Sequence, residues 1–234
     1  MERQLFLIAA KAPEPGQVKT RLGTRIGMER AAHLYAAFLR DLASRFTAAG
    51  AGAFDLGWAY TPASADFGAL LARIGCVPQP SRVRYVPQEG EGWDVRQANL
   101  LRWGHEQGYR RVVLVGSDSP QLPVATIDTA FQALREHDVA IGRTHDGGYY
   151  LIGMRGFHDV LTGVPMSTVS AAEALIARAR EQGLSFAELP ETFDIDEEGD
   201  LAHLHAICTG DDISTPATCA ALRHLGLDQF AHRA

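Results

Sequence analysis

A short apolar run that stops at a glycine, with an aspartate two residues later, constrains most what this chain can fold into. Residues 111–123 read RVVLVGSDSPQLP, and four of the first five are apolar, three of them β-branched. Such a run is typical of a strand buried on both faces in the middle of a parallel sheet. Ligands of open α/β sheets bind at the carboxyl ends of these strands, so we expect Asp118 at that edge, where it could hold a hard cation. The alternative is that Asp118 only caps the helix expected after Pro123.

The rest of the chain alternates between strand-like and helix-like segments. Strands are predicted over residues 4–10, 54–60, 82–86, 111–115, 139–142, 149–154 and 185–189. Helices are predicted over residues 28–49, 66–73, 94–107, 125–136, 170–182, 200–207 and 216–225, the first of them closed by Gly50 and Gly52. Alternation of this kind predicts an α/β fold, with a sheet between two layers of helices. No linker or repeat interrupts it, so residues 1–234 are expected to form a single domain.

Composition excludes several classes of function. The 234 residues are 46% hydrophobic and carry a net charge of −6 with no basic run, which argues against a nucleic-acid partner. The N-terminal apolar run ends at Lys11 and is too short for a signal peptide or a membrane span, so we expect a cytoplasmic protein. Cys76, Cys208 and Cys219 are scattered and form no CxxC pair. They are therefore expected to be reduced packing residues, with neither a disulfide nor a zinc site.

The segment that follows the first predicted strand, residues 11–21 (KAPEPGQVKTR), has the composition of a phosphate-binding loop. Proline and glycine break both regular periods here, so irregular structure is predicted throughout. The loop carries both lysines of the chain, Lys11 and Lys19, in a protein that otherwise uses arginine. Together with Arg21 and free backbone N–H groups, they could cradle an anion. The spacing matches neither a Walker A loop nor a GxGxxG motif, and a solvated basic loop is the alternative.

Three further segments could contribute to a site. The turn Asp146-Gly147-Gly148-Tyr149 allows another molecule to approach the backbone closely, although such a sequence also suits a simple hairpin. Asp194 and Asp196 flank Ile195, so in extended backbone both could point the same way and complete a cation site; the alternative is an acidic helix start. The loop at residues 89–93 (EGEGW), which includes Gly90, could cover a nucleotide base or sugar, or it could be a plain surface turn.

Three of these segments, in this order, resemble the bacterial glycosyltransferase-like family associated with radical-SAM and selenoprotein-like neighbours. The motifs are KAPxPGxVKTRL, GSDSPxLP and DGGYYLIG, and the resemblance extends from about residue 5 to residue 201. The family belongs to the nucleotide-diphospho-sugar transferase superfamily, which implies the GT-A fold: a three-layer α/β/α sandwich around a mixed, mostly parallel sheet. It also implies a nucleotide or nucleotide-sugar donor, a small-molecule acceptor and a Mg²⁺ or Mn²⁺ ion.

The resemblance also implies roles for individual residues. Donor phosphates and nucleotide would contact Lys11, Pro15, Gly16, Lys19, Thr20, Arg21, Gly90 and Ser117. The metal would bind Asp118 with Asp194 or Asp196, and the acceptor would lie against Asp146, Gly147, Gly148 and Tyr149. Asp118, Lys19 and Asp146 are the candidate catalytic residues. No residue stands out as a general base, and Asp146 is our candidate, which requires it to lie within hydrogen-bond reach of the acceptor hydroxyl.

One local departure favours a different transfer. Sugar transferases usually present Asp-x-Asp at the metal, whereas this chain has Ser117-Asp118-Ser119. Asp118-Ser119-Pro120 instead resembles the Asp-x-Pro pattern of molybdopterin and phospholactate nucleotidyltransferases, and residues 18–22 (VKTRL) resemble the first loop of the phospholactate enzymes. Glycosyl transfer and nucleotidyl transfer therefore both stay open, as does a non-catalytic nucleotide-binding module. The acceptor, and the base and sugar of the donor, are not indicated.

Overall fold

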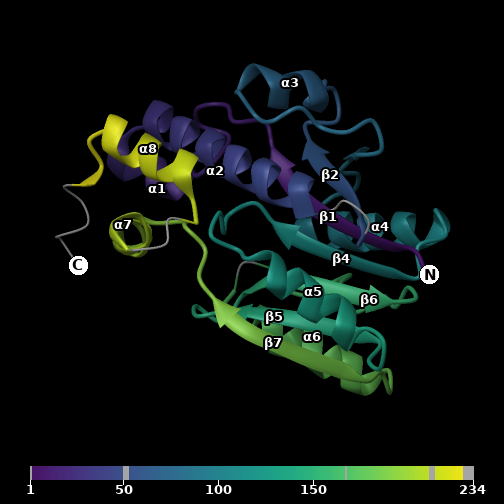
Figure 1. Cartoon of the computed structure of the whole chain (residues 1–234). Helices are drawn as coiled ribbons and strands as arrows, with labels where there is room; N and C mark the ends of the chain where they lie inside the picture. Colours follow the sequence, from purple (N-terminus) through teal and green to yellow (C-terminus); the bar gives the residue numbers. More distant parts are fainter. Residues whose placement is uncertain (1, 50–52, 167, 211–213, 229–234) are drawn as a thin grey trace.

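A seven-stranded sheet forms the centre of the protein in the computed structural model, which describes residues 2–49, 53–166, 168–210 and 214–228 (Figure 1). The strand order is β3-β2-β1-β4-β6-β5-β7. In chain order the strands are β1 (Gln4–Lys11), β2 (Asp55–Thr61), β3 (Arg84–Pro87), β4 (Arg111–Gly116), β5 (Val139–Thr144), β6 (Tyr149–Arg155) and β7 (Phe186–Thr192).

The sheet is mixed, because β6 runs antiparallel to both of its neighbours, β4 and β5. The remaining pairs, β1–β2, β1–β4, β2–β3 and β5–β7, are parallel. The start of β6 therefore lies at the same edge of the sheet as the carboxyl ends of β1 and β4. The predicted mixed, mostly parallel sheet is confirmed.

Helices cover both faces of this sheet. They are α1 (Thr20–Ile26), α2 (Met28–Ala49), α3 (Phe67–Arg73), α4 (Trp93–Glu106), α5 (Val124–Ala133), α6 (Ala171–Glu181), α7 (Leu201–Thr209) and α8 (Pro216–His224), with a 3₁₀ turn at Glu198–Asp200. Because side chains alternate along a strand, Phe6 and Ile8 join the core under α2 and α5, while Leu5 and Leu7 join the core under α4 and α6. None of the described helices is both long enough and apolar enough to cross a bilayer.

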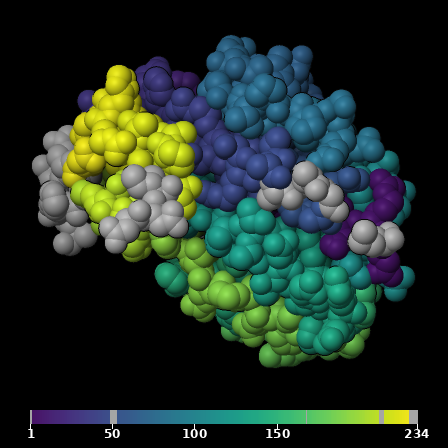
Figure 2. Space-filling model, viewed as in Figure 1, coloured from purple at the N-terminus to yellow at the C-terminus, as the bar shows by residue number. Residues whose placement is uncertain are grey.

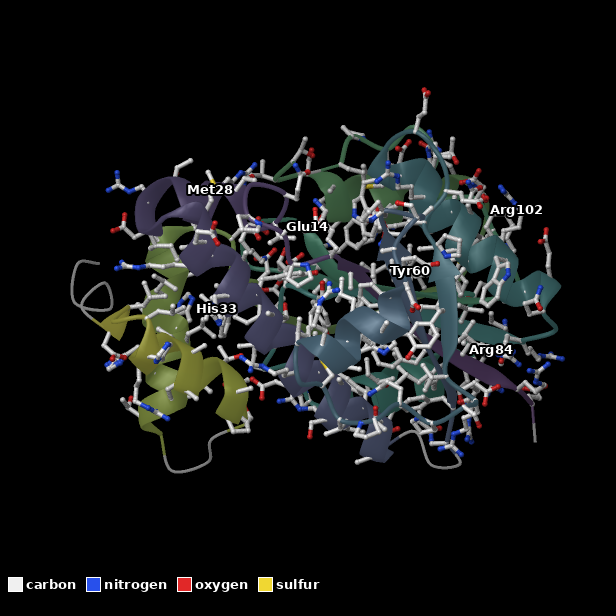
Figure 3. All side chains as sticks on the ribbon, turned by 90° about the horizontal axis from the view of Figure 1, so that it is seen from above. Glu14, Met28, His33, Tyr60, Arg84 and Arg102 are labelled. Atoms are coloured by element: carbon white, nitrogen blue, oxygen red, sulfur yellow. A yellow bond between two sulfur atoms is a disulfide. The ribbon has the colours of Figure 1, made fainter. Side chains whose placement is uncertain are left out.

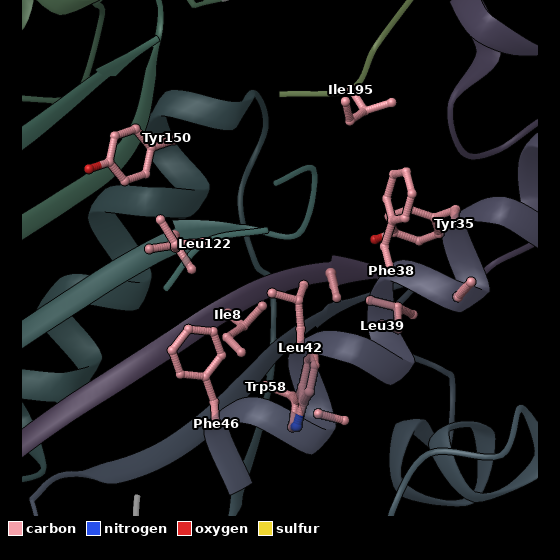
Figure 4. Close-up of a cluster of buried hydrophobic side chains, with 14 of the residues drawn as sticks. Ile8, Tyr35, Phe38, Leu39, Leu42, Phe46, Trp58, Leu122, Tyr150 and Ile195 are labelled. Carbon is pink, nitrogen blue, oxygen red and sulfur yellow. The ribbon is translucent and has the colours of Figure 1, made fainter. Parts of the chain in front are cut away.

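The longest helix, α2, has the bounds that its amphipathic pattern predicts. Tyr35, Phe38, Leu42 and Phe46 lie on one stripe of α2 and are at most 2% exposed, packed against the sheet (Figure 4). The glycines expected to close this helix lie outside the described residues.

The first loop is shorter than the sequence suggests. β1 continues through Lys11, and α1 begins at Thr20, so the prediction of irregular structure throughout residues 11–21 is wrong at both ends. The proline and glycine residues lie at positions 13–16, so they interrupt regular hydrogen bonding only in the middle of the segment. Viewed from above, Glu14 of this loop lies between Met28 and Tyr60 in projection (Figure 3).

The cysteine prediction is also wrong for two of the three residues. Cys208 of α7 and Cys219 of α8 form a disulfide, whereas Cys76 is free and buried. The two cysteines lie on successive helices, and only the tertiary packing of those helices brings their side chains together. In Figure 2 the C-terminal helices (yellow) cover part of the surface of the N-terminal helices. The buried Asp41 of α2 accepts hydrogen bonds from the backbone N–H groups of Ala217 and Thr218, so it caps α8.

Candidate active site

A cavity of about 620 Å³ opens at the carboxyl ends of β1 and β4, where the strand pattern predicts a ligand. It is bounded by the loop after β1, the loop after β4, the β5–β6 turn and the segment after β7. The predicted site residues that line it are Lys11, Lys19, Thr20, Arg21, Ser117, Asp118, Asp146, Gly148, Tyr149, Asp194 and Asp196. Four others, Pro15, Gly16, Gly90 and Gly147, are not part of its lining.

The ammonium of Lys19 lies between two of the predicted carboxylates. Lys19 Nζ donates to Asp196 Oδ1 at 2.7 Å and also contacts Asp118 Oδ1. The Lys19 side chain is only 3% exposed, whereas the side chains of Asp118 and Asp196 are 45% and 44% exposed. Lys19 itself has a left-handed backbone (φ 46°) at the residue before α1. The cluster therefore buries a cation beneath two accessible carboxylates.

Electrostatics keep this cluster charged. Burial alone would lower the pKa of Lys19, but the charges of Asp118 and Asp196 raise that pKa above its ordinary value. Burial opposes ionisation of Asp196, yet the adjacent Lys19 holds the pKa of Asp196 below its usual range. Asp194 differs, because burial and the neighbouring charges of Asp196 and Asp146 raise its pKa to about 6.

Backbone and side-chain hydrogen bonds tie the Asp118 loop to the segment after β7. The backbone N–H of Ile195 donates to the carbonyl of Asp118 at 3.0 Å. Ser119 Oγ and Gln121 Nε2 both donate to the carbonyl of Phe193, at 3.0 and 2.6 Å. Ile195 is fully buried, close to the aromatic residues of α2 (Figure 4), so Asp194 and Asp196 on either side of it both reach the cavity.

A buried tyrosine joins the first two loops beneath the cavity. Tyr35 Oη forms a 2.7 Å hydrogen bond with Ser117 Oγ and accepts the backbone N–H of Lys11 at 3.0 Å. Burial, reinforced by the charge of Asp118, raises the pKa of Tyr35 to about 12, so the hydroxyl is neutral near pH 7. Sequence reasoning placed Tyr35 only on the core stripe of α2. Its apolar neighbours gave no indication that its hydroxyl reaches the sheet edge.

The Asp-Gly-Gly segment is a hairpin turn that also faces the cavity, so the two interpretations of its sequence are compatible. Asp146 Oδ1 accepts hydrogen bonds from Thr144 Oγ1 at 2.5 Å and from the backbone N–H of Gly148 at 3.0 Å. Gly147 has φ +88°, and a Cβ built there would lie 2.0 Å from the carbonyl oxygen of Val169. The turn thus requires glycine because another segment packs directly against its backbone.

The opposite wall includes residues that were not predicted from the sequence. Gln97 of α4 is 2% exposed and donates to Tyr149 Oη at 2.6 Å, and that hydroxyl lies 3.1 Å from the sulfur of Met166. Gln88, directly after β3, is held by the carbonyls of Ala10 and Ala59. Gln88 could have been found from the sequence, because it is a polar residue at the end of a predicted strand. Gln97 could not, because it lies within a regular helical pattern.

The donor set at this edge fits a divalent cation that also binds phosphate. Asp118 and Asp196 direct one oxygen each to a common point, the position of Lys19 Nζ. Mg²⁺ is commonly held by one or two carboxylates together with substrate phosphates, so two converging carboxylates suffice. Among the described residues no group of three His, Cys, Asp or Glu side chains could hold a metal without such a ligand.

Comparison with known proteins places the chain in a family. Residues 41–168, more than half of the chain, match the model of DUF2064, described as an uncharacterized protein conserved in bacteria. The chain belongs to this family. A crystal structure from Desulfovibrio desulfuricans G20, of a proposed nucleotide-diphospho-sugar transferase, is 32% identical with a TM-score of 0.86, over 98% of this chain and 99% of that one. No curated protein matches the chain significantly in sequence.

More distant solved structures share only the fold with this DUF2064 protein. A cytidylyltransferase from Leptospira borgpetersenii serovar Hardjo-bovis (strain JB197) is 11% identical, with a TM-score of 0.56 over 100% of this chain and 98% of that one. The synthetase of CMP:2-keto-3-deoxy-manno-octonic acid, complexed with CTP, is 14% identical, with a TM-score of 0.50 over 88% and 98%. The fold is therefore the one found in nucleotide-diphospho-sugar transferases and cytidylyltransferases.

Proposed function

We propose that this protein is a transferase that uses a nucleotide-activated donor and a divalent cation, with a nucleotide-diphospho-sugar as the donor. The observation that supports this most directly is the meeting of three cations and two carboxylates, from loops far apart in sequence, in one cavity. Lys11, Lys19 and Arg21 line the same cavity as Asp118 and Asp196. A site with both signs of charge suits a metal-bound diphosphate, which presents a cation to carboxylates and oxygens to ammonium and guanidinium groups.

The phosphates would lie over the loop after β1. Lys11 is exposed at the end of β1, and the Arg21 side chain is 65% exposed, with its Nη1 3.6 Å from Glu197 Oε1. Arg21 can turn toward a ligand at little energetic cost, because an exposed ion pair contributes little to stability, and Lys11 is exposed to solvent. Thr20 and Ser117 line the same region and offer neutral hydroxyls.

Asp118 and Asp196 are the residues that would hold Mg²⁺ or Mn²⁺, and Asp194 lines the same cavity. When bound, the ion would neutralise phosphate charge and stabilise the leaving group. The chain's own contribution is to hold the two carboxylates in register through the contacts of Ile195, Ser119 and Gln121 with the neighbouring segment. Preorganisation of this kind avoids reorganisation during the reaction.

In the transfer step an acceptor oxygen attacks the anomeric carbon of the donor sugar. The bond between that carbon and the diphosphate breaks, the nucleoside diphosphate leaves with the electron pair, and the acceptor proton passes to a base. Asp146 is our candidate for the base, because its carboxylate lines the cavity at the β5–β6 turn. The Gly148 backbone and Tyr149 beside it would contact the acceptor.

Nucleotidyl transfer is the second candidate, and the Ser117-Asp118-Ser119-Pro120 sequence favours it. There the acceptor oxygen would attack the α-phosphorus of a nucleoside triphosphate, and pyrophosphate would leave. The same cations and carboxylates would serve, because the charge to be neutralised again lies on a diphosphate leaving group.

A binding panel followed by a product assay tests these candidates. Thermal unfolding is measured with each nucleoside di- and triphosphate, and with UDP- and GDP-sugars, with and without Mn²⁺. A ligand selective for the folded state raises the midpoint by mass action. Release of nucleoside diphosphate from a nucleotide sugar, with cell extract as the acceptor source, would support glycosyl transfer, and release of pyrophosphate would support nucleotidyl transfer. Nucleotide binding without any product would point to a binding module, and no nucleotide binding at all would refute the proposal.

A further inference from the structure

The position between Asp118 and Asp196, where the proposed metal would bind, is taken by a group of the protein itself. Lys19 Nζ contacts Oδ1 of both carboxylates, and its side chain is almost fully shielded from solvent. The Phe38 ring, with its centroid 5.9 Å from Nζ, lies beneath it. The ammonium therefore occupies a site built from groups of opposite charge and an aromatic face.

An ammonium and a divalent ion compete for the same oxygens. Two carboxylates and one ammonium leave a net charge of −1 at the cluster, whereas adding a divalent ion would place three positive charges against two negative ones. Repulsion between cations at such short range is large where water is scarce. The free protein should therefore bind a divalent ion poorly for as long as Lys19 stays in place.

Phosphate can remove this obstacle. Lys19 also lines the cavity, beside Lys11 and Arg21, so a polyanion there offers its ammonium a second set of oxygen partners. Its four-carbon side chain can turn from one set to the other without movement of the backbone.

We propose that Lys19 excludes divalent cations from the free protein, and that the phosphates of a nucleotide admit them by drawing the Lys19 ammonium away from Asp118 and Asp196. The second half of this inference rests on the proposed function, since it needs a nucleotide in the cavity. It implies positive coupling between the two ligands, in which each raises the affinity for the other.

Titration of the nucleotide-free protein with Mn²⁺, followed by the electron paramagnetic resonance signal of the free ion, tests the first half. Lys19→Met should bind Mn²⁺ at least tenfold more tightly than the wild type, because both carboxylates lose their competitor. Arg30→Met removes an exposed positive charge of α2 outside the cavity lining, and should change the affinity less than threefold. The double variant Lys19→Met/Asp118→Asn should lose the gain.

Equal or weaker Mn²⁺ binding by Lys19→Met would overturn the inference. Circular dichroism of each variant checks folding, and Lys19→Gln, which removes the charge but keeps a hydrogen-bond donor, should give the same gain if the methionine variant is unstable.

Nucleotide binding is measured separately, by thermal shift with nucleoside diphosphates in EDTA, so that chelation of the ion by free nucleotide plays no part. If a diphosphate binds the wild type but Lys19→Met gains no Mn²⁺ affinity, this inference fails and the proposed function stands. If Lys19→Met gains Mn²⁺ affinity and no nucleotide binds, cation exclusion stands, and both the release by phosphate and the proposed function fail. If the wild-type protein binds Mn²⁺ no more tightly when it is saturated with the diphosphate, phosphate does not draw Lys19 away from Asp118 and Asp196, and that part of the inference fails.

Discussion

Two regions of the cavity carry carboxylates, and they are built in opposite ways. The cluster of Asp118, Lys19 and Asp196 joins residues up to 177 positions apart, and its central charge is buried. The side chain of Asp146 is exposed, and its hydrogen bonds reach only Thr144 and Gly148, two residues away. The first region depends on long-range contacts to hold its charges together, whereas Asp146 is held by its own turn, against which residue 169 packs. Substitutions should therefore affect charge handling in the first region and loop geometry in the second.

The largest effect is expected at Asp118. Asp118→Asn removes one of the two carboxylates proposed to hold the cation, and should lower kcat/KM for the donor identified by the binding panel by about 10²–10³-fold. Asp118 also compensates the buried charge of Lys19, so the variant should in addition lower the free energy of unfolding. Steady-state kinetics and denaturant unfolding separate the two quantities. Full activity of Asp118→Asn would show that the cluster of Asp118, Lys19 and Asp196 does not take part in catalysis.

Gly147→Ala probes the packing of the turn. The added Cβ would lie 2.0 Å from the Val169 carbonyl oxygen at a φ of +88°, so we expect a loss of about 2–4 kcal/mol in the free energy of unfolding. Gly183→Ala is the matched control, because φ there is +68° and no atom lies within 4 Å of the new Cβ. It should cost only about 1 kcal/mol. If the two variants lose equal free energies of unfolding in urea, the close packing of the turn against residue 169 does not contribute to stability.

A pair of substitutions at Asp146 separates turn geometry from charge. Asp146→Asn keeps an oxygen to accept from Thr144 and from the Gly148 backbone, whereas Asp146→Ala removes it. If the carboxylate is the base, both variants should lose about 10²-fold in kcat with little change in donor affinity. If Asp146 only shapes the turn, Asp146→Asn should retain near wild-type kcat. Rapid-quench measurement of the transfer step, with donor binding measured alongside, distinguishes the two outcomes.

The smallest effect concerns an ion pair that the site does not use. Arg155, at 2.8 Å, together with the hydroxyl and backbone N–H of Ser185, holds the pKa of Asp138 well below its usual range. A carboxylate with a lowered folded-state pKa stabilises the protein above its unfolded pKa of about 4 and loses that contribution as the pH falls further. Asp138→Asn should therefore destabilise the protein by about 1 kcal/mol at pH 7 and by less near pH 2, as measured by urea unfolding at each pH. A loss that does not depend on pH would contradict this.

Much of the fold could be predicted from the sequence, because the patterns involved are local. The period of α2 gave Met28–Ala49, and the β-branched run at residues 111–115 gave a fully buried central strand. The loops that follow β1 and β4, the β5–β6 turn and the Asp194–Asp196 segment were predicted to lie together, and they line one cavity.

The sequence by itself determined which residues stand at strand ends, because apolar runs, glycines and prolines act over a few positions. Only the tertiary structure decided which of those residues meet. It placed the Lys19 ammonium against Asp118 and Asp196 and brought the Tyr35 hydroxyl to Ser117. It also paired Cys208 with Cys219, which the spacing of the cysteines did not suggest. The physical reason is that charge pairing, desolvation and disulfide formation depend on distances in space, and those distances are set by how the sheet and helices pack.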